Sequence, residues 1–223
     1  MNTVFDVQYA IKLIPIMLKY VKVTLLLSGL SMIFGVILAV IISLIFNKKI
    51  KILTPILKIY VSFFRGTPLI AQLFLVYFGF VQVMPSLRGM TSFQAAFIVL
   101  SLNSSAFMSE SIRGAISSID KGQMDAALSI GMTYGQAMRR IILPQAIRVA
   151  IPALSNSFIS IVKSSSLAFT IGVTEMMASA QMEATSSYRY LEAFTDIAIV
   201  YWVLILIMSF IQRKIELKLN EWY

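Results

Sequence analysis

Polar side chains recur at helical spacing inside apolar stretches of this chain. Asn156, Ser160 and Lys163 step by four and three residues, which places them on one face of a helix. Asn103 and Glu110 are seven residues apart and share about one face of another. Polar groups are costly inside a membrane and mark solute or ion pathways. We therefore expect these residues to bind a small polar solute rather than to catalyse a reaction.

A cation also lies within an apolar run, where Arg65 opens the sequence Arg-Gly-Thr-Pro at 65–68. Pro68 lacks an amide hydrogen and Gly66 lowers helix stability, so a local helix break is predicted here. An unwound backbone beside a cation suits a solute path. Alternatively, Arg65 pairs with a carboxylate such as Glu110, or extends to the membrane interface as an anchor. The sequence leaves both interpretations open.

Several kinds of chemistry are excluded by residues that the chain lacks. It has no histidine and no cysteine, so the commonest general base, the commonest metal ligand and all disulfides are absent. No G-x-x-x-x-G-K-[ST] loop is present to hold nucleotide phosphates. Met176, Met177 and Met182 are interpreted as apolar packing residues rather than metal ligands. We predict no catalytic residue, no metal site and no cofactor bound by this chain.

The composition is that of a membrane protein. Of the 223 residues, 58% are hydrophobic and 13% are charged, and the mean hydropathy is +0.84. A soluble domain typically has about 25% charged residues. The net charge of +9 does not indicate nucleic-acid binding, because the basic residues flank apolar segments.

Five apolar segments are long enough to cross a bilayer as helices. The first is too long for the roughly 7–15 apolar residues of a signal peptide, so we expect it to be retained. Before it, apolar residues at three- and four-residue steps, beginning at Val4, predict an amphipathic helix at the interface. The predicted elements are the amphipathic helix at 3–20 and spans at 23–46, 54–83 (interrupted at 65–68), 92–112, 146–163 and 192–211.

The distribution of Lys and Arg predicts the orientation of these spans. Positive residues gather in the connections 47–58 and 113–148 and after the last span, and are sparse in the alternate connections. Positive connections stay in the cytoplasm. The N-terminus is therefore predicted outside the cell, and the C-terminus and segment 113–148 inside.

The cytoplasmic segment before the fourth span is predicted to contain two short helices. The first covers 120–130 and ends at Gly131, which adopts positive φ without penalty. Thr133 is a plausible N-cap for a second helix over 134–143, and Pro144 either starts the next helix or kinks the chain. A structural elbow explains such a segment. Its length of about 30 residues, however, exceeds the usual 2–8 residues of a helix connection. A partner-binding role is therefore at least as well supported as the structural elbow.

The same segment resembles the "EAA" motif of ABC-transporter permease subunits, which reads E-A-A, three residues, G, nine residues, I, one residue, L-P. Asp replaces Glu at the first position, which keeps the charge and shortens its reach. The matching residues are Asp125, Ala126, Ala127, Gly131, Ile141, Leu143 and Pro144.

Three more stretches, at 64–79, 102–116 and 143–167, are similar to polar amino acid uptake permeases and follow the family's order. Related permeases often have Lys-Asp-Thr-Ser-Leu where this chain has Lys163-Ser164-Ser165-Ser166-Leu167. The missing aspartate disfavours a cationic amino acid. The segment looks most like that of cystine importers, so L-cystine is the expected substrate.

The resemblance implies an all-α integral membrane protein of the type I ABC importer permease fold, with one domain over 1–223 and the coupling loop at about 117–144. It implies two ATP-binding subunits that hold ATP and Mg, a second permease subunit, identical or similar, and an extracellular substrate-binding protein, all at the bacterial cell membrane. The helix at 120–131 would dock on the ATPase. The predicted substrate pathway comprises Arg65, Thr67, Gln72, Asn103, Glu110, Asn156, Ser160, Lys163 and Ser164.

Alternative interpretations remain for several of these features. A channel or secondary transporter would use 113–144 as a regulatory or structural loop, although such transporters usually have more spans in repeated halves. A membrane enzyme is disfavoured by the missing His and Cys. Ser101 to Ser105 suit close helix packing, and Lys163 suits an anchor at the outer interface. Segment 167–190, which contains Glu175, Gln181 and Glu183, is expected on the outer side, either as a docking surface for the binding protein or as a solvated re-entrant loop or plain helix ends.

Overall fold

The computed structural model describes residues 5–220, and within that range it contains helices and turns but no strand. Four helical segments in this range are long and apolar enough to cross a membrane. Each contains one of the predicted apolar segments, and each is longer than the segment that it contains. Their principal helices are α2 (Val21–Lys48), α6 (Ser92–Ser117), α9 (Leu143–Ser164) and α11 (Tyr190–Asn220).

The remaining apolar segment is a broken helix. Helix α3 (Leu53–Gly66) is followed by α4 (Leu69–Phe74), the π-helical turn η1 (Leu75–Gly79) and α5 (Phe80–Val83). The two halves are bent by 112° at the predicted break. Thr67 and Pro68 have extended backbone there, since proline disfavours helical conformation in the residue before it. Counted as one span, the broken helix brings the described residues to the predicted five spans.

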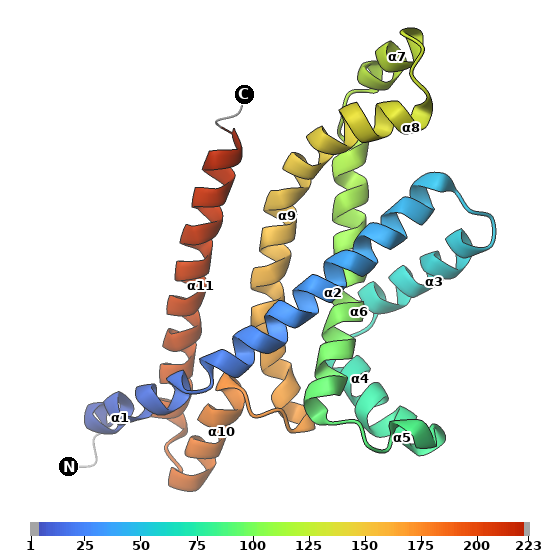
Figure 1. Cartoon of the computed structure of the whole chain (residues 1–223). Helices are drawn as coiled ribbons and strands as arrows, with labels where there is room; N and C mark the ends of the chain where they lie inside the picture. The colour runs from blue at the N-terminus through green and yellow to red at the C-terminus, as the bar shows by residue number, and fades with distance from the viewer. Residues whose placement is uncertain (1–4, 221–223) are drawn as a thin grey trace.

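Two shorter helices pack against the start of α11. Helix α1 (Val7–Leu18) buries Ala10, Leu13 and Met17 against α10 (Met176–Ser187) and α11. The predicted amphipathic helix is therefore present, although Val4 of its predicted face lies outside the described residues. Figure 1 shows α1 and α10 at one end of the molecule and the C-terminal end of α11 at the other.

The most extensive helix contact joins α2 to α6, and small residues make it close. A Cβ atom added at Gly35 would lie 2.5 Å from Ser104 Oγ and 2.7 Å from Met108 Cε. Ser101 and Ser105 are buried and donate to backbone carbonyl groups of α6. These serines therefore pack helices together, as one of the sequence interpretations expects.

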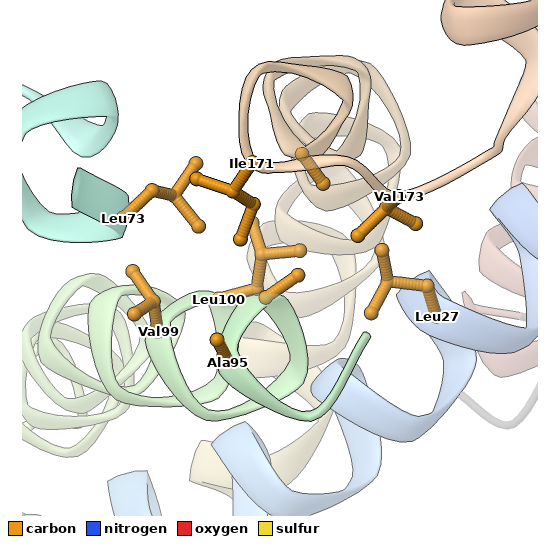
Figure 2. Close-up of a cluster of buried hydrophobic side chains, with 9 residues drawn as sticks. Leu27, Leu73, Ala95, Val99, Leu100, Ile171 and Val173 are labelled. Atoms are coloured by element: carbon orange, nitrogen blue, oxygen red, sulfur yellow. The ribbon is translucent and has the colours of Figure 1, made fainter. Parts of the chain in front are cut away.

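An apolar core joins the broken helix to α2 and α6 near the end of the molecule that carries α10. Leu73 of α4 meets Val99 and Leu100 of α6, and Leu27 of α2 meets Val173 beyond the 3₁₀ turn η4 (Ser165–Ile171) (Figure 2). This core fixes α4 relative to α6, so the helix break above it has a defined position.

The segment between α6 and α9 projects beyond the spans (Figure 1). It contains α7 (Lys121–Ser129), α8 (Tyr134–Ala137) and the π-helical turn η3 (Met138–Ile142). The expected second short helix is not separate, because α8, η3, α9 and η4 form one helical path over 134–171. Pro144 is the second residue of α9 and comes directly after the π-helical turn η3 and Leu143, so the chain neither stops nor starts a separate helix there. A further 3₁₀ turn, η2 (Pro85–Leu87), precedes α6.

Candidate translocation cavity and coupling loop

A cavity of about 680 Å³ lies between the α3–α4 break, α6 and α9. We call it the central cavity. Its volume is within the range of about 300–1,000 Å³ that is typical of small-molecule sites. Its lining combines polar groups with Phe64, Phe107 and other apolar residues. Seven of the predicted pathway residues line it: Arg65, Thr67, Asn103, Glu110, Asn156, Ser160 and Ser164.

Two predicted pathway residues do not line this cavity. Lys163 is exposed near the end of α9, which fits the alternative interpretation of an interfacial anchor. Gln72 is only 2% exposed, and its side chain is occupied by hydrogen bonds inside the protein.

The Gln72 amide holds the helix break together. Its Nε2 donates to the carbonyl oxygens of Phe64 and Thr67, each at 3.1 Å, and to Thr67 Oγ1 at 2.8 Å. Asn103 Nδ2 donates to Phe64 O at 3.1 Å and to Gln72 Oε1 at 3.0 Å. The break frees carbonyl groups that lipid cannot satisfy, and these two amides satisfy them. Gln72 and Asn103 are therefore positioning residues for the wall that carries Arg65.

Charged groups meet at one side of the central cavity. Glu110 accepts a hydrogen bond from Arg113 Nη2 at 2.5 Å, whereas Arg65 Nη1 lies 3.8 Å from Glu110 Oε2. The Arg65 guanidinium also lies over the Phe107 ring, 5.6 Å from its centroid, and its side chain is 45% exposed. Arg113 thus takes the closer contact with Glu110. Arg65 is paired only loosely, so its guanidinium can bind an anionic group.

Helix α11 contributes a polar residue that the sequence interpretation missed. Gln212 Nε2 donates to Asn156 Oδ1 at 3.1 Å and to Glu216 Oε1 at 2.8 Å. The amide of Asn156 is therefore oriented from the neighbouring span. Gln212 comes one residue after the apolar run of the fifth span, so its position at a span end was the available signal.

The coupling loop has the turn that its sequence predicts. Gly131 has φ +84°, Gly131 N donates to Leu128 O at 3.0 Å, and Met132 N donates to Ala127 O at 3.1 Å. This pair of hydrogen bonds is a Schellman motif, which ends α7. Thr133 caps α8 with a capping box that includes Gln136, as predicted for Thr133.

The motif residues divide between the inside and the surface of this loop. Asp125 and Ala126 are exposed, whereas Ala127 is 2% exposed and packs α7 towards η3. Ile141 and Leu143 are half-buried and Pro144 is exposed. Ala127 therefore shapes the loop and is not available to touch a partner directly.

Apolar side chains that the motif does not include stand out from the same loop. Leu128 is 44% exposed, Ile130 is 76% exposed and Tyr134 is 52% exposed. Tyr134 Oη also donates to Asn47 Oδ1 of α2 at 3.4 Å, which ties the loop to a span. Apolar residues in an otherwise polar stretch were the signal for these candidate contacts.

A buried carboxylate lies on the opposite side of the molecule from the coupling loop. Glu175 Oε2 accepts from Tyr201 Oη at 2.8 Å and from Thr24 Oγ1 at 3.5 Å, and Glu175 Oε1 accepts from Ala178 N at 2.8 Å. We call Glu175, Thr24 and Tyr201 the Glu175 cluster. Its carboxylate is 0% exposed, and burial raises the pKa of Glu175 above its ordinary value.

The Glu175 cluster corrects one expectation about the outer segment. Glu175 joins α10 to α2 and α11 and cannot belong to a docking surface, because no part of it reaches solvent. Gln181 and Glu183 of the same segment are half-buried. Among residues 5–220, no group of three carboxylates is placed to hold a metal ion.

Comparison with known proteins identifies the family of the chain. Residues 31–221 match the model of the family described as binding-protein-dependent transport system inner membrane component. The chain is 51% identical to the probable amino-acid ABC transporter permease protein PatM of Vibrio harveyi, over 98% of each chain.

Two relatives from Bacillus subtilis carry substrate names. The arginine transport system permease protein ArtQ is 40% identical over 97% of this chain and 98% of its own. The L-cystine transport system permease protein TcyB is 41% identical over 93% of this chain and 88% of its own. Overall identity therefore does not separate these two substrates.

The fold agrees with a solved transporter. The crystal structure of an amino acid ABC transporter with histidines matches with a TM-score of 0.89 at 36% identity, over 96% of this chain and 99% of that one. The sequence resemblance to ABC-transporter permeases and the all-α fold are thus confirmed. The chain belongs to the family of binding-protein-dependent transport system inner membrane components.

Proposed function

We propose that this chain is the membrane-spanning subunit of an ATP-driven importer for a polar amino acid. The observation that carries the proposal is the central cavity, in which a loosely paired Arg65, the amide of Asn156 and several hydroxyls converge inside an apolar bundle. Similarity to permeases that are named for amino-acid transport supports the same substrate class.

The chemistry of the cavity suits a zwitterion. Arg65 offers a guanidinium fork to an α-carboxylate, and such charge-assisted contacts are among the stronger hydrogen bonds. Glu110 is largely neutralised by Arg113, so it attracts a cationic side chain only weakly. Ser164 replaces the aspartate of related permeases on the same wall. We propose L-cystine as the substrate on these grounds, ahead of arginine.

Helix α7 would couple ATP hydrolysis by a partner subunit to movement of the spans. Its exposed residues Asp125, Ala126 and Leu128, together with Ile130 directly after it, present a small surface with a mixed polar and apolar character. This surface would dock on a separate ATPase subunit that binds ATP and Mg. We infer two such ATPase subunits, a second permease subunit, identical or similar, and an extracellular substrate-binding protein. Closure of the ATPase pair would rock the spans around the central cavity between two states.

The proposed orientation places α7 and the C-terminal end of α11 in the cytoplasm of a bacterial cell, with α1 outside the inner membrane. Figure 1 shows α7 and the end of α11 at the same end of the molecule, with α1 at the other. Lys48, Lys49 and Lys51 follow α2 and Arg213 and Lys214 lie near the end of α11, in connections that the positive-inside rule assigns to the cytoplasm.

The test is uptake into proteoliposomes that contain the chain, its ATPase and its binding protein, with a panel of labelled amino acids. We expect ATP-dependent uptake of a polar, uncharged amino acid, with L-cystine preferred. Uptake of arginine or histidine alone would contradict the preference for cystine. Transport that persists without any ATPase would contradict the importer and favour a channel or secondary transporter.

Coupling is tested by Gly131→Val. A β-branched residue disfavours φ +84°, at a cost of about 1–2 kcal/mol, so α7 loses its turn. We expect co-purification of the ATPase and ATP-driven uptake to fall by about tenfold or more. Gly135→Ala is the matched control, because Gly135 lies in α8 with no atom within 4 Å of an added Cβ.

A further inference from the structure

A second cavity, of about 770 Å³, lies between the C-terminal end of α2, α3 and the C-terminal part of α6. We call it the basic cavity. It shares only Arg65 and Glu110 with the central cavity, so this pair forms the wall common to both. The basic cavity has no role in the mechanism above.

Positive charge exceeds negative charge around the basic cavity. Lys49, Lys58, Arg65 and Arg113 line it, and Glu110 is the one carboxylate in its lining. Arg113 and Arg65 contact Glu110, but within residues 5–220 neither lysine ammonium makes an ion pair or a side-chain hydrogen bond. Two unpaired ammonium groups beside a neutralised carboxylate leave a site that attracts an anion.

The end of α2 fixes the position of one of these lysines. Lys49 ends α2 in the left-handed conformation that is common at helix C-termini, with φ 51°, and its N–H donates to Phe46 O at 3.2 Å. Thr54 also lines the cavity, but its Oγ1 is buried and has no hydrogen-bond partner among the described residues. The two lysine ammonium groups are therefore the groups that an anion in this cavity would meet.

The surface of α3 indicates where the anion comes from. Ile52 is 74% exposed, Ile56 is 55% exposed and Ile59 is 72% exposed, at helical spacing. Thr54 and Lys58 lie on the side of the same helix that lines the basic cavity. An apolar stripe beside a basic cavity fits acyl chains and a headgroup of one molecule, as in cytoplasmic-side lipid sites.

We propose that the basic cavity binds the phosphate of an anionic phospholipid headgroup, from the leaflet on the α7 side. Lys49 and Lys58 contact the phosphate, and the acyl chains follow the exposed stripe of α3. The site needs only that the spans lie in a bilayer, so it stands apart from the identity of the transported solute.

The test is native mass spectrometry of the delipidated full chain in detergent. Dioleoylphosphatidylglycerol is titrated against dioleoylphosphatidylcholine, which has the same acyl chains and no net charge. We expect the anionic lipid to bind preferentially. Lys49→Gly and Lys58→Gln should each weaken its binding by about fivefold, because a basic residue near an anionic lipid is worth about that factor. Lys49→Gly also relieves the left-handed backbone, so the variant keeps the fold.

Lys51→Gln is the matched control, because Lys51 lies in the same turn but does not line the cavity. It should leave binding of the anionic lipid unchanged. Equal binding of the two lipids, or an equal loss in Lys51→Gln, would overturn the site. Displacement of the lipid by equimolar inorganic phosphate or glycerol 3-phosphate would show a free-anion site and overturn the lipid assignment.

Discussion

The central cavity and the Glu175 cluster both place polar groups inside an apolar bundle, but they use them differently. Around the central cavity, Arg65 is 45% exposed and meets its carboxylate only at 3.8 Å. In the Glu175 cluster the carboxylate is 0% exposed and accepts three hydrogen bonds from two side chains and one backbone amide. The first arrangement leaves capacity for a solute, and the second has none left.

This difference distinguishes polar groups that can bind a solute from polar groups that stabilise the fold, and it does so more reliably than residue type does. Both regions combine a carboxylate with hydroxyl groups, and both carboxylates lie close to other polar side chains. What distinguishes them is whether the hydrogen-bonding groups are already satisfied within the protein. Gln72 illustrates the point, because it lies next to the central cavity yet behaves like a member of a saturated cluster.

The largest expected effect comes from Gln72→Leu. Leucine fills the space but leaves Thr67 O without its donor and Asn103 Nδ2 without its acceptor on residue 72. Each unsatisfied buried group costs about 1–3 kcal/mol, so we expect a loss of about 2–4 kcal/mol in the free energy of unfolding. The measurement is the thermal unfolding midpoint of the purified chain in detergent, together with uptake.

Gln181→Leu is the control for Gln72→Leu. The Gln181 amide donates only to Thr185 Oγ1, at 3.3 Å in an exposed position, so its loss should change stability by at most about 0.5 kcal/mol. A Gln72→Leu variant with normal stability but impaired uptake would show that Gln72 binds the solute and does not mainly stabilise the helix break.

The next effect in size is expected from Arg65→Gln. If Arg65 binds the α-carboxylate of the substrate, its loss removes a charge-assisted contact worth about 1.5–3 kcal/mol. The KM for uptake should then rise by about tenfold to a hundredfold, with a stable protein. Arg88→Gln, which changes a cation outside the cavity lining, is the control. An unchanged KM would favour the interfacial-anchor interpretation of Arg65.

Much of this molecule follows from its sequence where the physical signal is local. The apolar runs predict the four long spans, and Gly66 with Pro68 predicts the break of the remaining one. Gly131 and Thr133 predict the turn and the cap of the coupling loop. In each case a residue's own backbone preference or the length of an apolar run decides the structure, so no distant contact has to be known.

Other features depend on contacts that sequence spacing does not specify. Gln72 meets Asn103 across 31 residues of sequence, and Glu175 meets Thr24 across 151. Gln212 reaches Asn156 from another span. Helical spacing shows which residues share a face, but it does not show whether that face meets a cavity or another helix. For this reason the sequence did not predict that Lys163 lies outside the lining of the central cavity or that Glu175 is buried.

The smallest expected effect is a pH dependence at the Glu175 cluster. Because burial raises the pKa of Glu175 above its ordinary value of 4.5, the folded protein holds this proton more tightly than the unfolded chain. The stability that the neutral carboxyl contributes is complete below pH 4.5 and is lost as pH rises through the raised pKa. The unfolding midpoint should therefore fall as pH rises across that window.

Glu175→Gln tests this assignment, because glutamine keeps an oxygen acceptor for Tyr201 but cannot ionise. Its amide nitrogen cannot accept from Ala178 N, so the variant should have a lower midpoint than the wild type at low pH. Its midpoint should not fall across the window, so the pH dependence of the difference between the two curves isolates the carboxyl. Glu175→Ala should be less stable at every pH, since Tyr201 Oη and Ala178 N lose their acceptor. If instead Glu175→Gln impaired uptake without changing the pH profile, this carboxylate would belong with the solute-binding groups, and saturation of hydrogen bonds would fail as the criterion that separates the two regions.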